Sequence, residues 1–160
     1  MDTGTGDTEH RSAAEVAALQ REWIFGWDRV EGDPLRAFAD VFGRYYDFDA
    51  DVLLFDDADP ERRTHRRVAD YADAFWPTFS ALRSARHAIA EEPEVLVSGD
   101  LAAARMVFVA VLVSAEGEAT RLRCYNSQVW GRTDASGWHI LRDQTAIYPI
   151  SQAEADSSFG

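Results

Sequence analysis

The spacing of apolar residues predicts helices in the first half of the chain. The first apolar face recurs at intervals of three and four residues, which is typical of an amphipathic helix. A capping-box pattern, Ser12-Ala-Ala-Glu15, opens this helix, and we expect it to end at Gly32. Its face consists of Val16, Leu19, Trp23, Trp27 and Val30.

Two further helices follow from the same spacing. Asp33 and Pro34 predict the start of the second, because an aspartate caps free N–H groups and a proline at the first position has none to satisfy. Its inward stripe consists of Leu35, Phe38, Phe42 and either Tyr45 or Tyr46. The third should be kinked or divided at Pro77. Its apolar face consists of Val68, Tyr71, Ala72, Phe75, Trp76, Phe79 and Leu82.

From Arg83 onward the pattern changes to strands, preceded by one short apolar strand at 52–55. The expected strands are at about 84–90, 94–98, 102–114, 119–132 and 137–150. Three helices followed by such a meander predict an α+β domain over 12–150, in which a curved antiparallel sheet closes around the helices as a cone-shaped barrel with an internal pocket. The polar ends, 1–11 and 151–160, are expected to be a disordered arm and a disordered tail.

Composition removes several classes of function. The chain has 160 residues and a net charge of −12, which disfavours binding to nucleic acid and to anionic membranes. It has no lysine, so Schiff-base chemistry and a phosphate-binding lysine are excluded. Cys124 is the single cysteine and is expected to be a structural thiol. No signal peptide or membrane span is evident, so we expect a cytoplasmic protein. Three of the four histidines, His65, His87 and His139, are not clustered, and we expect no metal and no cofactor.

Polar side chains in the last two strands indicate a pocket. They fall at both odd and even positions, so at least one polar set should face inward, where polar groups are costly unless they are paired. The set of greatest interest is Asn126, Gln128, Asp143 and Thr145.

The register of this hairpin decides whether the set shares one face. A four-residue loop at 134–137 pairs Gln128 with Asp143, whereas a five-residue loop pairs Gln128 with Arg142. We adopt the first register, which also pairs Asn126 with Thr145. It places the polar set on one face together with Trp130 and Leu141.

The order of elements and several local strings resemble the nuclear-transport-factor-2-like superfamily, in its SnoaL-like and ketosteroid-isomerase-like branch. The strings are Leu53-Leu-Phe-Asp-Asp-Ala-Asp-Pro60, Phe75-Trp-Pro-Thr-Phe79, Val97-Ser-Gly-Asp100, Val129-Trp-Gly-Arg132 and Gly137-Trp-His-Ile-Leu141. The resemblance implies a cone with a pocket between helices and sheet, and a homodimer formed through the outer face of the sheet. It implies no single reaction, because this fold carries many.

The resemblance also implies a general-base aspartate just after the first strand, matched by Asp56 or Asp57, or less well by Asp59. Strand alternation puts Asp57 on the same face as Phe55, which is expected to point to the pocket, so Asp57 is the catalytic candidate. Other features of the family are missing. The first helix has no tyrosine, Gln144 stands where many SnoaL-like chains have a histidine, and Gln128 replaces a pocket arginine.

Two functions therefore remain open. One is a domain that binds a small, largely apolar molecule in its pocket. The other is a cyclase, isomerase or dehydratase that uses Asp57 as general acid–base. Arg105 is either an outer-face residue or a buried counter-charge for an anionic ligand. A homodimer is expected, because residues 102–114 are apolar on both faces. The ligand-binding candidates are Tyr46, Tyr71, Trp76, Phe79, Arg105, Asn126, Gln128, Trp130 and Asp143.

Overall fold

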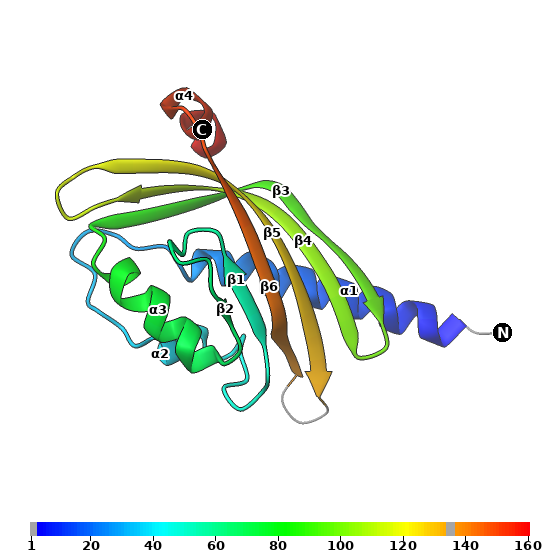
Figure 1. Ribbon diagram of the computed structural model, residues 1–160. Coiled ribbons are helices and arrows are strands. Elements are labelled where there is room, and N and C mark those ends of the chain that lie inside the picture. The colour runs from blue at the N-terminus through cyan, green and yellow to red at the C-terminus, as the bar shows by residue number, and fades with distance from the viewer. Residues whose placement is uncertain (1–2, 134–136) are drawn as a thin grey trace.

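The computed structural model describes residues 3–133 and 137–160 and consists of one curved sheet with three of its four helices on the concave side (Figure 1). The helices are α1 (Thr3–Phe25), α2 (Phe38–Phe42), α3 (Val68–Ser80) and α4 (Gln152–Phe159). The strands are β1 (Leu53–Asp56), β2 (Thr64–His65), β3 (Ser84–Ser98), β4 (Leu101–Val113), β5 (Ala119–Thr133) and β6 (Gly137–Pro149). None of the helices described is both long and apolar enough to span a membrane.

The sheet confirms the predicted α+β class and corrects the barrel and the strand directions. Its six strands have the order β2-β1-β6-β5-β4-β3, so β2 and β3 form two free edges and the cone is open. β3 to β6 form the expected antiparallel meander, but β1 runs parallel to β6, and the sheet is mixed. This parallel pair brings the end of β1 beside the middle of β6, where the polar residues of the last strand lie.

Bulges account for much of the curvature. The two strands expected at 84–90 and 94–98 form the single strand β3, whose register against β4 shifts between Ile89 and Glu91 and again between Glu91 and Glu94. Such bulges bend a strand and increase its twist. Pro93 is tolerated within β3 because this is an edge strand and the proline lies in the irregular segment.

The helix boundaries differ from the predicted ones for local reasons. α1 begins at Thr3, so the described part of the expected arm at 1–11 is helical. α1 ends at Phe25 rather than at Gly32, and Gly26 then packs closely against the helical layer: a Cβ there would lie 2.8 Å from the Phe42 ring. Asp33 caps a turn instead of a helix, because its carboxylate accepts a hydrogen bond from the Val30 N–H. α3 contains Pro77 without being divided.

The C-terminal segment is ordered, contrary to the tail expected at 151–160. Ser151 and Glu154 form a reciprocal capping box that starts α4. α4 contacts β3, β4 and β5 on the outside of the sheet, as Figure 1 shows at its upper end. Val107 and Val109, which alternate with inward-facing residues of β4, are fully buried on this side. Part of the apolar outer face is therefore covered by the chain's own end.

Candidate functional site

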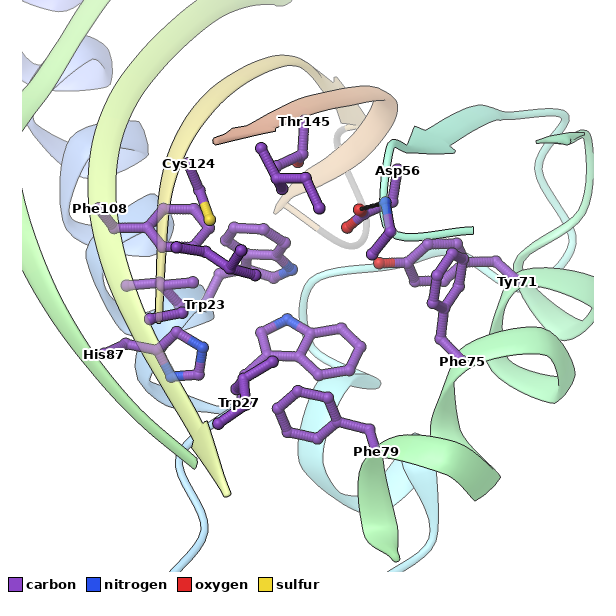
Figure 2. A pocket seen from close by; sticks show the side chains of 16 residues that line it. Trp23, Trp27, Asp56, Tyr71, Phe75, Phe79, His87, Phe108, Cys124 and Thr145 are labelled. Carbon is purple, nitrogen blue, oxygen red and sulfur yellow. Dashed lines mark hydrogen bonds between the residues drawn. The ribbon is translucent and has the colours of Figure 1, made fainter. Parts of the chain in front are cut away.

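A pocket lies between the helices and the concave face of the sheet (Figure 2). Its volume is about 120 Å³, and most of its wall is apolar. α1 and the turn after it contribute Trp23 and Trp27, and α3 contributes Tyr71, Phe75 and Phe79. The sheet contributes Phe108, Ala110, Leu112, Leu122, Cys124 and Ile147. The polar wall residues are Asp56, His87 and Thr145.

Asp56 is the carboxylate that faces this pocket (Figure 2). It is the last residue of β1, and strand alternation places it on the same inward face as Leu54, which is fully buried. Burial raises the pKa of Asp56 to about 6, and the neighbouring Asp57 and Asp59 charges add to the rise, against a lowering by the Ala58 N–H hydrogen bond. A carboxyl group with this pKa can exchange protons near neutral pH.

Asp57, the predicted catalytic residue, does not line the pocket. Its carboxylate lies 3.3 Å from the Arg62 guanidinium on the other side of the strand. The alternation along β1 was predicted correctly, but the inward face was not, because Leu54 points into the core and Phe55 lies on the opposite face of the strand. Asp59, the third candidate, is held by Arg63 at 3.0 Å, and this hydrogen bond lowers the pKa of Asp59 to about 2.

The predicted polar set forms a buried hydrogen-bond network behind the pocket. The Asn126 side-chain amide donates to Asp143 Oδ1 at 2.7 Å and to Thr145 Oγ1 at 2.9 Å. Gln128 donates to the same Asp143 oxygen at 3.4 Å. Asn126, Gln128, Asp143 and Thr145 are each at most 4% exposed. Thr145 is the member of this set that lines the pocket. The other three side chains are linked to the pocket only through the hydrogen bond between Asn126 and Thr145.

Burial raises the pKa of Asp143 to about 7, opposed by the hydrogen bond from Asn126 and increased by the nearby Asp56 charge. No arginine of the described chain is paired with Asp143 to offset the burial, so the protonated form is far more populated near neutral pH than for an exposed carboxyl. The network also contains Gln20 of α1, whose amide donates to Asn126 Oδ1 at 3.0 Å and whose own oxygen is buried without a partner in the described chain. Gln20 was not predicted. Its position, four residues after Val16 and three before Trp23 on the inward face, was the available signal.

The hairpin register at the site is the predicted one, but it arises differently. Near the turn, Thr133 pairs with Gly137 and Trp130 with Ile140. A bulge at Leu141 then shifts the ladder by one residue, so that Gln128 faces Asp143. Ile140, instead of the expected Leu141, shares the buried face. Of the loop expected at 134–137, residues 134–136 lie outside the described residues.

The two predicted tyrosines lie together beside the carboxylates. Tyr71 lines the pocket, and Tyr46 lies behind it, with its hydroxyl hydrogen-bonded to Tyr71 and accepting from Trp23 Nε1 at 3.0 Å. Burial, together with the charges of Asp143 and Asp56, raises the pKa of both phenols well above the ordinary value. Both tyrosines therefore stay protonated and can act only as neutral hydrogen-bonding groups.

The other predicted ligand-binding residues divide into three groups. Phe79 lines the pocket as expected. Trp130 is fully buried deeper in the core, and Trp76 does not line the pocket but packs against Trp27, with ring centroids 5.8 Å apart, while its Nε1 donates to the Arg36 carbonyl at 2.7 Å. Arg105 points outward from β4 and pairs with Glu94 at 3.3 Å and with Glu91 at 3.6 Å. The buried counter-charge alternative for Arg105 is therefore wrong.

His87 is a pocket residue that the sequence did not single out. It lies on β3, across the pocket from Asp56 in Figure 2. Its Nδ1 lies 2.8 Å from the Asp28 carboxylate, which also accepts the His87 backbone N–H at 2.9 Å. A carboxylate on Nδ1 fixes the ring orientation and leaves Nε2 as the group available for proton transfer.

Neither Cys124 nor the other described side chains form a metal centre. Burial, with a smaller contribution from the Asp56 charge, raises the pKa of the Cys124 thiol to about 12, so it stays protonated and unreactive. Within residues 3–133 and 137–160, no group of three histidine, cysteine or carboxylate side chains lies close enough together to hold an ion.

Comparison with known proteins places the fold. No protein-family model matches the sequence, and no curated protein matches it significantly. Among solved structures, a nuclear-transport-factor-2-like protein from Salmonella enterica superposes with a TM-score of 0.72 at 15% identity, over 89% of this chain and 94% of that one. The association domain of the calcium/calmodulin-dependent kinase II of C. elegans superposes with a TM-score of 0.61 at 13% identity, over 88% and 98%.

A protein from Shewanella frigidimarina with a provisional ketosteroid isomerase assignment has a TM-score of 0.58 at 12% identity, over 84% of this chain and 94% of that one. At such identities the similarity concerns the fold and leaves the reaction open. The open, curved sheet around three helices, with its pocket on the concave side, is therefore a nuclear-transport-factor-2-like fold.

Proposed function

We propose that the protein binds a small, largely apolar molecule with a single ring in the pocket bounded by Trp27, Phe79 and Asp56. The observation that supports this most directly is the pocket itself, about 120 Å³ and mostly apolar, with one carboxylate on its wall. An apolar cavity of about 150 Å³ accommodates benzene. A steroid or a fused polyketide is larger than this space, so the ligand class is narrower than the resemblance implied.

Thermal unfolding in the presence of small ring compounds tests this proposal. A ligand at a hundredfold excess over its dissociation constant should raise stability by about 2.7 kcal/mol. Toluene, phenol and cyclohexanone should raise the melting temperature, and four-ring steroids should not. Ala110→Leu adds bulk at the pocket wall and should abolish the shift. Ala103→Leu, on the exposed outer face of the same strand, is the matched control. Shifts that are equal in both variants would place binding elsewhere.

A second candidate function is proton-transfer catalysis of the isomerase, cyclase or dehydratase type. Asp56 and His87 face the same pocket from opposite walls, which is the arrangement needed for proton removal at one carbon and return at another. The catalytic assignment thus moves from Asp57 to Asp56. Tyr71 and Thr145 are the neutral hydroxyl groups available to a developing oxyanion.

The isomerisation of cyclohex-3-enone to its conjugated isomer, followed by ultraviolet absorbance, tests this candidate with a ligand of the right size. Asp56→Asn should lower the rate by roughly a hundredfold or more, because the amide keeps the shape and cannot take a proton. Asp57→Asn is the matched control, since Asp57 pairs with Arg62 outside the pocket. Equal rates in wild type and Asp56→Asn would reject catalysis by Asp56 and leave ligand binding untouched.

We also propose a homodimer formed through the outer face of the sheet. α4 covers Val107 and Val109, which belong to the segment 102–114 that the sequence analysis expected at the dimer interface. The partner subunit must therefore contact another part of this face. The outer face still exposes large apolar side chains, namely Leu96, Leu101, Tyr125 and Tyr148. A patch of this kind favours association.

Sedimentation of two leucine variants tests the dimer. Leu96→Glu should weaken association, since Leu96 is 80% exposed on the outer face of β3. Leu35→Glu should have no effect, since Leu35 is 71% exposed but lies outside the sheet. A wild-type monomer at micromolar concentration would contradict the dimer.

A further inference from the structure

The hydrogen-bond network behind the pocket has a fixed direction. Trp130 Nε1 can only donate, and it lies 3.1 Å from Gln128 Oε1. The Gln128 amide nitrogen therefore faces Asp143 and donates to its Oδ1. That oxygen is consequently an acceptor. Because one donor-only atom starts the chain, the orientation of each following amide is determined.

Asn126 connects Asp143 to Thr145 at the pocket wall, and its orientation follows from that of Gln128. Its amide nitrogen donates to the same Asp143 oxygen at 2.7 Å and, with its second hydrogen, to Thr145 Oγ1 at 2.9 Å. The Asp143 acceptor requires the Asn126 nitrogen to face it, so the Asn126 oxygen faces Gln20 and accepts from the Gln20 amide. Thr145 therefore accepts a hydrogen bond from behind the wall, and its own hydroxyl hydrogen makes no bond within the described residues.

The Thr145 hydroxyl therefore has a hydrogen left to donate at the pocket wall, and a carboxylate stands on the neighbouring strand. Thr145 lines the pocket and is 3% exposed. In the parallel pair of β1 and β6 its Cα partner is Asp56, the pocket carboxylate. One end of a mostly apolar cavity, opposite His87, thus presents a hydroxyl donor and a carboxylate acceptor from neighbouring strands (Figure 2).

We propose that Thr145 selects the ligand: a neutral, single-ring molecule carrying a hydroxyl group, whose oxygen accepts from Thr145 and whose hydrogen is donated to Asp56. This proposal rests on the pocket being the ligand site. A hydroxyl satisfies both groups at once, and a hydrocarbon leaves both unpaired, which is costly in a buried site. A carboxylate-bearing ring is disfavoured, because it would place a second anion against Asp56. Asn126 is a positioning residue, since it orients the Thr145 hydroxyl without reaching the ligand.

Calorimetric titration with phenol, toluene and benzoate tests the selection. Phenol and toluene have the same number of non-hydrogen atoms and differ in the hydroxyl group. The ratio of phenol affinity to toluene affinity should fall roughly tenfold from wild type to Thr145→Val, the loss expected for one hydrogen bond. Thr145→Ser should keep the wild-type ratio. Benzoate should bind to none of the proteins at concentrations at which phenol saturates the wild-type pocket.

Toluene binding to Thr145→Val serves as the control for an intact pocket. If that variant does not fold, Thr145→Ala should show the same loss of ratio. An unchanged ratio in all variants would overturn the role of Thr145. The donor to the phenol hydroxyl would then be sought at Trp27, which also lines the pocket. Benzoate binding as tight as phenol binding would overturn the selection of neutral ligands. If neither toluene nor phenol bound to the wild type, the pocket proposal itself would fail, which is a distinct result.

Discussion

Asp143→Asn should stabilise the protein at pH 8 by about 4 kcal/mol and should remove most of the dependence of its stability on pH. Folding raises the pKa of the Asp143 carboxyl from 3.8 to about 7. Between these values the folded state holds a proton that the unfolded state has released. The contribution of Asp143 to stability is therefore complete below about pH 4. It is lost at about 1.4 kcal/mol per pH unit between pH 4 and pH 7, and above pH 7 both states are ionised and the loss stays constant.

The asparagine should be accepted because it keeps the acceptor oxygen that Asn126 and Gln128 use, and it carries no charge at any pH. Asp56, whose pKa is also raised, should leave a smaller residual slope of the same sign. Urea unfolding at pH 5 and pH 8 measures the effect. Asp73→Asn is the control, since Asp73 is exposed on α3 and its replacement should change neither value. A wild type that is more stable at pH 8 than at pH 5, with no gain from Asp143→Asn, would show that Asp143 is ionised in the fold.

The fold class could be predicted because long strands and amphipathic helices have distinct periodicities. The third helix and the strands of the meander were therefore located to within a few residues. The ends of the helices could not be, because they depend on contacts distant in sequence. Position 26 must be a glycine because any side chain there would collide with the Phe42 ring. The Asp33 carboxylate already accepts a hydrogen bond from the Val30 N–H in a turn, so it does not cap a helix. α4 has a clear capping box, but its short, polar sequence gave no reason to expect the sheet surface on which it packs.

The candidate site was predicted only in part, because it too depends on contacts between residues distant in sequence. Alternation correctly separates Asp56 from Asp57, but it cannot say which face of β1 points inward. That face is set by the parallel pairing with β6, where Leu54 aligns with Asp143 and Asp56 with Thr145. Similarly, the polar set of the last hairpin was identified by its composition, and its alignment depends on a bulge at Leu141 that no turn rule supplies. Gln20 and His87 were missed because glutamine is mostly exposed in folded proteins and histidine is only intermediate, so neither residue type by itself indicates a buried site.

Trp27→Ala should be the most destabilising single change on the helical side of the pocket. Trp27 is 7% exposed and lies where the turn after α1 meets α2 and α3. Its ring centroid is 4.6 Å from that of Phe42 and 4.9 Å from that of Phe79, and Phe38, Tyr71 and Trp76 complete the cluster. Truncating a buried tryptophan costs about 3–5 kcal/mol, as lost transfer energy and as an unfilled cavity.

Urea unfolding of Trp27→Ala should show this loss, and Phe25→Ala should show less than about 1 kcal/mol, because Phe25 is 40% exposed at the end of α1. Since Trp27 also lines the pocket, its removal should enlarge the cavity toward α3. Free indole should then bind in the vacated space and raise the melting temperature of Trp27→Ala more than that of the wild type. A loss below 1 kcal/mol would mean that the aromatic cluster closes over the gap, and in that case indole should have no effect on the variant.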